Sequence, residues 1–119
     1  MSRRLNDLSP QMRAKAVEFL ARLVEERIAV LIVDTLRSPE EHAKNVAAGR
    51  SWVKHSKHLD GDAMDVCPYD IYEIGGRNKL NCDSSHPVWN RIAMIAEDCG
   101  LRSGHRRAQK DSGHVELPR

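Results

Sequence analysis

The stretch Ser56-Lys57-His58-Leu59-Asp60-Gly61-Asp62-Ala63-Met64-Asp65 places a histidine and a carboxylate seven residues apart, with a glycine between them. Imidazole nitrogens and carboxylate oxygens are both good zinc ligands. Seven residues is too far for adjacent turns of one helix, whereas a strand, a turn at Gly61 and a return strand would bring both side chains to one point. The stretch therefore predicts a metal site built on a hairpin, with His58 and Asp65 as ligands.

A third ligand has to come from elsewhere, and the best candidate is His114 near the C-terminus. Asp111 lies three residues before it, so a turn through the intervening Ser-Gly pair would let both side chains face the metal. Glu116 follows two residues later and on a strand would share a face with His114. It could orient a ligand histidine or compete with Asp111 as the general base.

The remaining pattern predicts an α+β domain, a small and mainly antiparallel sheet with helices packed against it. Ser9-Pro10 is typical of a helix start, and Pro87 and Gly100 bracket a last helix. Residues 29–33 form an apolar β-branched run that predicts a buried strand. The first helix is expected to present one apolar face, formed by Val17, Leu20, Ala21, Val24 and Ile28.

Arg37 falls between the end of that strand and a second helix, which Ser38 and Pro39 are expected to open and Gly49 to close. Its guanidinium could hold a substrate carboxylate or stabilise charge on a reacting carbonyl oxygen. From position alone, a surface arginine paired with Glu40 or Glu41 is the favoured interpretation.

Composition narrows the class of protein. The 119 residues suit a single domain spanning 1–119, and a net charge of +2 is too small to indicate nucleic-acid binding. The longest apolar run, residues 28–33, is far too short to insert into a membrane, and no apolar stretch of signal-peptide type follows Met1. We expect synthesis in the cytoplasm, and export or release by another factor if the substrate lies outside.

The cysteines do not form a zinc signature. Cys67, Cys82 and Cys99 contain no Cys-x-x-Cys pair, and we expect three reduced, partly buried thiols, although a disulfide between two of them is possible. Residues 67–85 look irregular and are a candidate specificity loop.

Two blocks carry a family resemblance. Ser56, His58, Gly61, Ala63 and Asp65 match Ser-x-His-x-x-Gly-x-Ala-x-Asp, and residues 111–117 match Asp-x-x-His followed by an apolar residue and Glu-Leu. The sequence thereby resembles the zinc D-alanyl-D-alanine carboxypeptidase and L-alanyl-D-glutamate endopeptidase group, which includes VanY-type enzymes and many phage endolysins. A Thr-x-Arg-Ser segment at Thr35, Arg37 and Ser38 also matches.

The resemblance implies a Hedgehog/DD-peptidase-like fold and a Zn²⁺ held by His58, Asp65 and His114. It further implies Asp111 as the acid/base carboxylate, Arg37 as the stabiliser of the oxyanion, and Ser56 as a hydrogen-bonding residue near the site. A donor set of two histidines and one carboxylate favours a catalytic zinc, because structural sites are usually closed by cysteines. Where the family commonly has Gly-Leu-x-Trp-Gly-Gly-Asp-Trp, residues 100–106 lack the aromatics, and His105 has no counterpart.

The resulting hypothesis is an endolysin-like, monomeric zinc peptidase that cleaves peptidoglycan stem peptides and acts on the cell wall after release. L-alanyl-D-glutamate endopeptidase activity is the favoured reaction, and D-alanyl-D-alanine carboxypeptidase activity is the second. A zinc-stabilised module that binds wall peptides without cutting them is the alternative from a different class. Asp111 argues against it, since a binder needs no base beside the metal.

Overall fold

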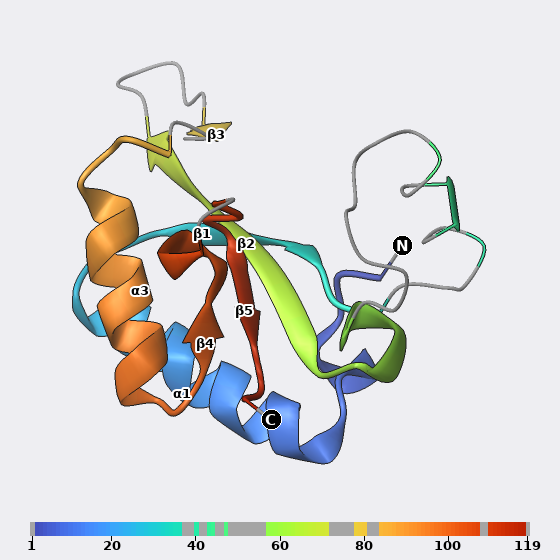
Figure 1. Ribbon diagram of the computed structural model, residues 1–119. Coiled ribbons are helices and arrows are strands. Elements are labelled where there is room, and N and C mark those ends of the chain that lie inside the picture. The colour runs from blue at the N-terminus through green and yellow to red at the C-terminus, as the bar shows by residue number, and fades with distance from the viewer. Residues whose placement is uncertain are drawn as a thin grey trace.

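The computed structural model describes residues 2–36, 40, 43–44, 47, 57–71, 78–80, 84–107 and 110–118, with the backbone alone for 69–71 and 78–80. Among these residues, helices α1 (Pro10–Glu25) and α3 (Val88–Asp98) pack against one antiparallel sheet (Figure 1). Its strands are β1 (Val30–Asp34), β2 (Ala63–Ile71), β3 (Asn78–Leu80), β4 (Arg102–Ser103) and β5 (His114–Glu116). The strand order is β1-β2-β5-β4, and β3 pairs with the far part of β2. The predicted α+β architecture is confirmed.

Helix α1 begins where the sequence predicts. Ser9 is the N-cap, and its Oγ accepts a hydrogen bond from the backbone N–H of Met12 at 3.3 Å, with Pro10 in the first turn. The same hydroxyl donates to Asp62 Oδ1 at 2.6 Å. The start of α1 is thereby tied to the segment between His58 and Asp65.

The predicted apolar face of α1 is wrong. Val17 and Val24 are 52% and 73% exposed, whereas the buried residues of the helix are Met12, Ala16, Phe19 and Leu23. Both sets have helical spacing, so periodicity alone does not choose between them. Packing chooses the set with Phe19, since this set lies in the core with α3 and the sheet.

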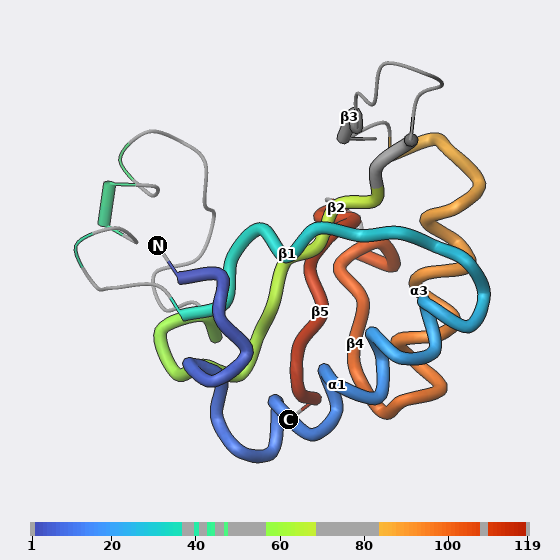
Figure 2. The backbone as a smooth tube through the Cα atoms, turned by 180° about the vertical axis from the view of Figure 1, so that it is seen from behind, coloured from blue at the N-terminus to red at the C-terminus, as the bar shows by residue number. Residues whose placement is uncertain are grey.

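Helix α3 supplies the other half of the core. It ends at Asp98 with Cys99 as its C-cap, and Gly100, which has a φ of +82°, follows directly and stops the helix as predicted. Its buried face, including Trp89 and Ile92, packs with α1 and with Met64, Val66 and Val115 of the sheet. Figures 1 and 2, which view the molecule from opposite sides, show the two helices as neighbours. Both helices therefore cover the same face of β2 and β5.

Two expectations about strands need correction. The strand at 30–34 is only half-buried, with Leu31 42% exposed, because β1 is the first strand in the sheet order and has a sheet neighbour in β2 alone. The stretch 67–85 is not wholly irregular, since β2 continues to Ile71 and pairs with β3. The strand extends because Leu31 and Val30 pair with Cys67 and the residue after it.

Several expectations fall on residues that are not described: Arg37, Ser56, Cys82, and most of the helix expected between Ser38 and Gly49. Cys67 and Cys99 are both buried, and no disulfide joins them. Among the helices that the structure describes, none is both long and apolar enough to cross a membrane.

Candidate active site

The pairing of β2 with β5 brings together two of the predicted ligands. Asp65 lies directly opposite His114, while Met64 lies opposite Val115. Because side chains alternate along a strand, Met64 and Val115 enter the helix-covered core and the Asp65–His114 pair occupies the other face. The N–H of Val66 donates to the carbonyl of Gly113 at 2.9 Å and extends this pairing past the ligands.

His58 reaches the site from a short helix rather than from a strand. Lys57–Asp60 is a 3-10 helix, so the expected hairpin is wrong at its first arm. Gly61 then turns the chain with a φ of +73°, and a Cβ there would lie 2.9 Å from the backbone nitrogen of Ser9. The turn is present as predicted. It requires glycine because other residues rarely adopt this φ and because the backbone of Ser9 leaves no space for a side chain.

The orientation of His58 is fixed by a backbone contact. Its Nδ1 lies 2.8 Å from the carbonyl oxygen of Thr35, an acceptor only, so Nδ1 carries the proton and donates. Nε2 is then the nitrogen with the available lone pair in the neutral ring, and it lies 3.3 Å from Asp65 Oδ1. The ring is 2% exposed. A backbone acceptor behind a buried imidazole is the usual way in which proteins orient a metal-binding histidine.

His114 is oriented in the opposite sense. Its Nε2 lies 2.9 Å from Glu116 Oε1, and its Nδ1 lies 3.1 Å from Asp65 Oδ1. With Nε2–H donating to Glu116, the Nδ1 lone pair of neutral His114 faces Asp65. Glu116 is itself balanced by Lys57, whose Nζ is 2.7 Å from Oε2, and by a close ion pair with Arg107. Of the two roles considered for Glu116, orienting a histidine is the one that agrees with this contact.

The donor atoms of His58, Asp65 and His114 all lie within 4.8 Å of one another. Two imidazole nitrogens and one carboxylate oxygen, each histidine backed by an acceptor on its other nitrogen, suit a borderline-soft divalent cation such as zinc. These residues therefore fit a metal site, and the structure brings together the three residues predicted as its ligands.

These charged groups shift one another's pKa values. Burial disfavours the Asp65 carboxylate, but the neighbouring His114 and then His58 outweigh burial and hold its pKa well below the usual range. Burial likewise opposes protonation of His114, yet its contacts with Asp65 and Glu116 raise its pKa to about 9. The site thus attracts positive charge, which is supplied by a proton on His114 when no metal is bound.

Asp111 lies beside the ligands as expected. Its Oδ2 is 4.0 Å from His114 Nδ1, and a turn through residues 112–113 carries the chain from one to the other, with the N–H of His114 donating to the Asp111 carbonyl at 3.0 Å. Burial, and next the negative charge of Asp65, raise the pKa of Asp111 above its usual value. A carboxyl that holds a proton more readily than usual is suited to proton transfer.

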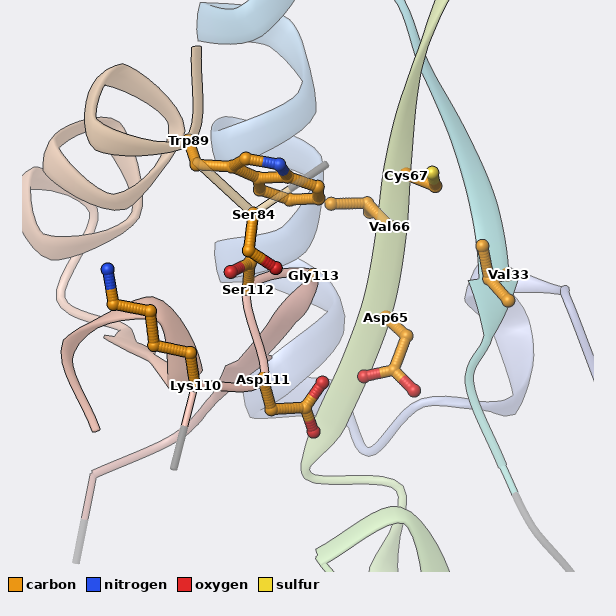
Figure 3. Close-up of a pocket in the computed structure, with 10 residues that line it drawn as sticks. All are labelled: Val33, Asp65, Val66, Cys67, Ser84, Trp89, Lys110, Asp111, Ser112 and Gly113. Carbon is orange, nitrogen blue, oxygen red and sulfur yellow. The ribbon is translucent and has the colours of Figure 1, made fainter. Parts of the chain in front are cut away.

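A cavity of about 380 Å³ opens beside Asp65 and Asp111 (Figure 3). Figure 3 shows these two carboxylates turned toward each other. The cavity continues from them toward the start of α3, where Trp89 and Ser84 line it. The cavity therefore offers space next to two of the predicted site residues.

The role of His105 was not predicted from the sequence. Its buried ring lies 2.8 Å from Ser112 Oγ and 3.1 Å from Asn90 Oδ1, and it stacks on Trp89. It thereby joins the segment around Asp111 to the start of α3. Its partners are distant in sequence or separated by a turn, so no local sequence pattern predicts these contacts.

Comparisons with known proteins agree on one family. The family model described as "Phage L-alanyl-D-glutamate peptidase" matches residues 1–105. An L-alanyl-D-glutamate peptidase of Escherichia phage T5 is 31% identical over 104 residues, which cover 72% of this chain and 73% of that protein. The match to the family model includes His58 and Asp65 but ends before Asp111 and His114.

The fold also has a solved counterpart. The crystal structure of Serratia marcescens L-Ala D-Glu endopeptidase ChiX matches with a TM-score of 0.71 and 24% identity, and the match covers 96% of this chain and 83% of that one. This likeness extends over the C-terminal segment that the family model leaves out.

Proposed function

Because the chain belongs to the phage L-alanyl-D-glutamate peptidase family, we propose that its L-alanyl-D-glutamate endopeptidase activity resides on the open face of β2 and β5, with zinc held by His58, Asp65 and His114. The observation that carries this assignment is the convergence of two histidine nitrogens on Asp65 Oδ1, at 3.3 and 3.1 Å. The substrate is the stem peptide of peptidoglycan, as for a phage endolysin.

The zinc ion and the protein would have separate roles in the reaction. Zinc in such a site supplies Lewis-acid chemistry, polarising a carbonyl and lowering the pKa of water. The chain itself fixes the ligands, because the Thr35 carbonyl orients His58 and Glu116 orients His114. Neither histidine needs to rotate to present its lone pair.

Asp111 is the proposed general base. It takes a proton from the attacking water and passes it to the nitrogen of the departing D-glutamyl residue. Its proximity to His114 and its raised pKa support this role. Arg37 as stabiliser of charge on the carbonyl oxygen, and Ser56 as a hydrogen-bonding residue, are proposed from the sequence resemblance, since both lie outside the described residues.

Mass spectrometry of purified peptidoglycan after incubation with the protein tests the proposal. We expect fragments with new N-terminal D-glutamate in the presence of zinc, and their loss with chelator or in Asp111→Asn. Asp98→Asn, which removes an exposed carboxylate on α3, is the matched control and is expected to retain activity. Release of D-alanine instead would indicate a carboxypeptidase. No cleavage by protein with verified zinc content would favour the binding module.

A further inference from the structure

Acidic, apolar and basic side chains all line the cavity beside the proposed ligands. Asp65 and Asp111 belong to the proposed site, and Val66 and Trp89 are among the apolar lining residues. Lys110, an exposed side chain that also lines the cavity, lies on the far side of Ser112 from Asp65 in Figure 3.

Lys110 differs from the other cations near the site. Lys57 and Arg107 both pair with Glu116 behind His114, so their charge is already balanced. In the described part of the chain, Lys110 makes no such ion pair, and it is the one basic residue that lines the cavity. Because it directly precedes Asp111, its position is coupled to that of the proposed base. The lining of the cavity therefore includes both the proposed base and a positive charge.

The substrate carries a matching negative charge. In an L-alanyl-D-glutamate bond, the glutamate nitrogen is acylated and its two carboxyl groups remain. The stem peptide continues through at most one of them, so the other is left free on the residue whose nitrogen departs. A carboxylate is thus a constant feature of the leaving side of this substrate, unless it is chemically capped as an amide.

We propose that this cavity is the subsite for the D-glutamyl residue, in which Lys110 binds the free carboxylate. The inference rests on the proposed function, and it adds what that function leaves open: how the enzyme recognises D-glutamate on the leaving side. Lys110 is a specificity residue, because it contacts a group that does not react.

Two synthetic peptides test this subsite, one with the free carboxylate on D-glutamate and one with the corresponding carboxamide. A charge-assisted hydrogen bond of a partly exposed lysine is expected to favour the carboxylate peptide by about tenfold in kcat/KM. Lys110→Met is expected to abolish this preference by raising KM for the carboxylate peptide alone. Lys110→Arg is expected to keep most of it. Arg106→Met is the matched control, because Arg106 is another exposed cation close to Lys110 in the sequence. It pairs with Glu97 of α3 and does not line the cavity.

The outcome that overturns the inference is a Lys110→Met enzyme with the wild-type preference, or one that loses both peptides equally. Equilibrium binding of the same two peptides to Asp111→Asn reports the Lys110 contact without turnover. Selective binding of the carboxylate peptide, lost on adding Lys110→Met, would support the subsite even if cleavage failed. Cleavage of both peptides without discrimination would leave the endopeptidase function standing and refute the subsite.

Discussion

Glu116 offers the sharpest test of how the proposed metal centre is held, because it contacts His114 but is not one of the proposed ligands. Its carboxylate accepts from His114 Nε2 at 2.9 Å and pairs with Lys57 at 2.7 Å, and it is 5% exposed. Glu116→Gln keeps the shape and can still accept one hydrogen bond, but it removes the negative charge. The change therefore isolates the electrostatic support of His114 from its packing.

The expected loss of zinc affinity is about 10- to 100-fold, the range found when groups behind metal ligands are removed. This corresponds to about 1.4 to 2.7 kcal/mol. Stability of the metal-free protein should fall separately by about 1 to 3 kcal/mol, since Lys57 and Arg107 lose the negative charge with which they pair. The two effects need separate measurements, because a less stable protein also binds metal more weakly.

Zinc affinity is measured by competition with a chromophoric chelator, and stability by urea unfolding in the presence of chelator. Asp98→Asn is the control, since it neutralises an exposed carboxylate far from the site and should change neither quantity appreciably. A Glu116→Gln protein with zinc affinity within about threefold of wild type, a difference too small for the loss of a ligand-orienting group, would refute the reasoning. Glu116 would then serve only to balance Lys57 and Arg107.

Three further outcomes follow from the geometry. Zinc binding near pH 7 should release about one proton, because His114 has a pKa of about 9 without metal and must lose its proton to act as a ligand. No proton should be released well above pH 9. Calorimetry in buffers of different ionisation enthalpy measures the number of protons released. Gly113→Ala places a Cβ 2.2 Å from the carbonyl oxygen of Val66, so it should lower zinc affinity and the urea midpoint together; an unchanged midpoint would contradict this packing. Phe19→Ala should cost about 3 to 5 kcal/mol in urea unfolding and Val24→Ala well under 1, a ranking that the face of α1 expected from sequence would reverse.

The site could be predicted more fully than the structure around it. His58, Asp65 and His114 belong to motifs whose chemistry restricts the choice of ligand, and the three do converge. The backbone carrying His58 was predicted wrongly, because the spacing of two ligands does not determine whether the first lies on a strand or on a short helix. His105 was missed because its contacts with Asn90 and Ser112 depend on tertiary structure.

The same limit explains the error in α1. Val17 and Val24 have the spacing of a core face, and so do Met12, Ala16, Phe19 and Leu23. The helix alone does not distinguish these faces, and only the position of α3 and the sheet buries the second one. The start of α1 was predicted correctly because the Ser9 cap is a local interaction.

The direct pairing of Asp65 with His114 across β2 and β5 makes the metal centre a reporter of strand alignment. A slip of one residue would turn His114 toward the helices and bring Val115 beside the carboxylate, because neighbouring side chains on a strand point to opposite faces. Zinc would thus bind only when the two strands are correctly aligned. Its binding free energy would stabilise that alignment relative to every form in which the strands are shifted. A chain that has bound the ion therefore already has β2 and β5 in their native register.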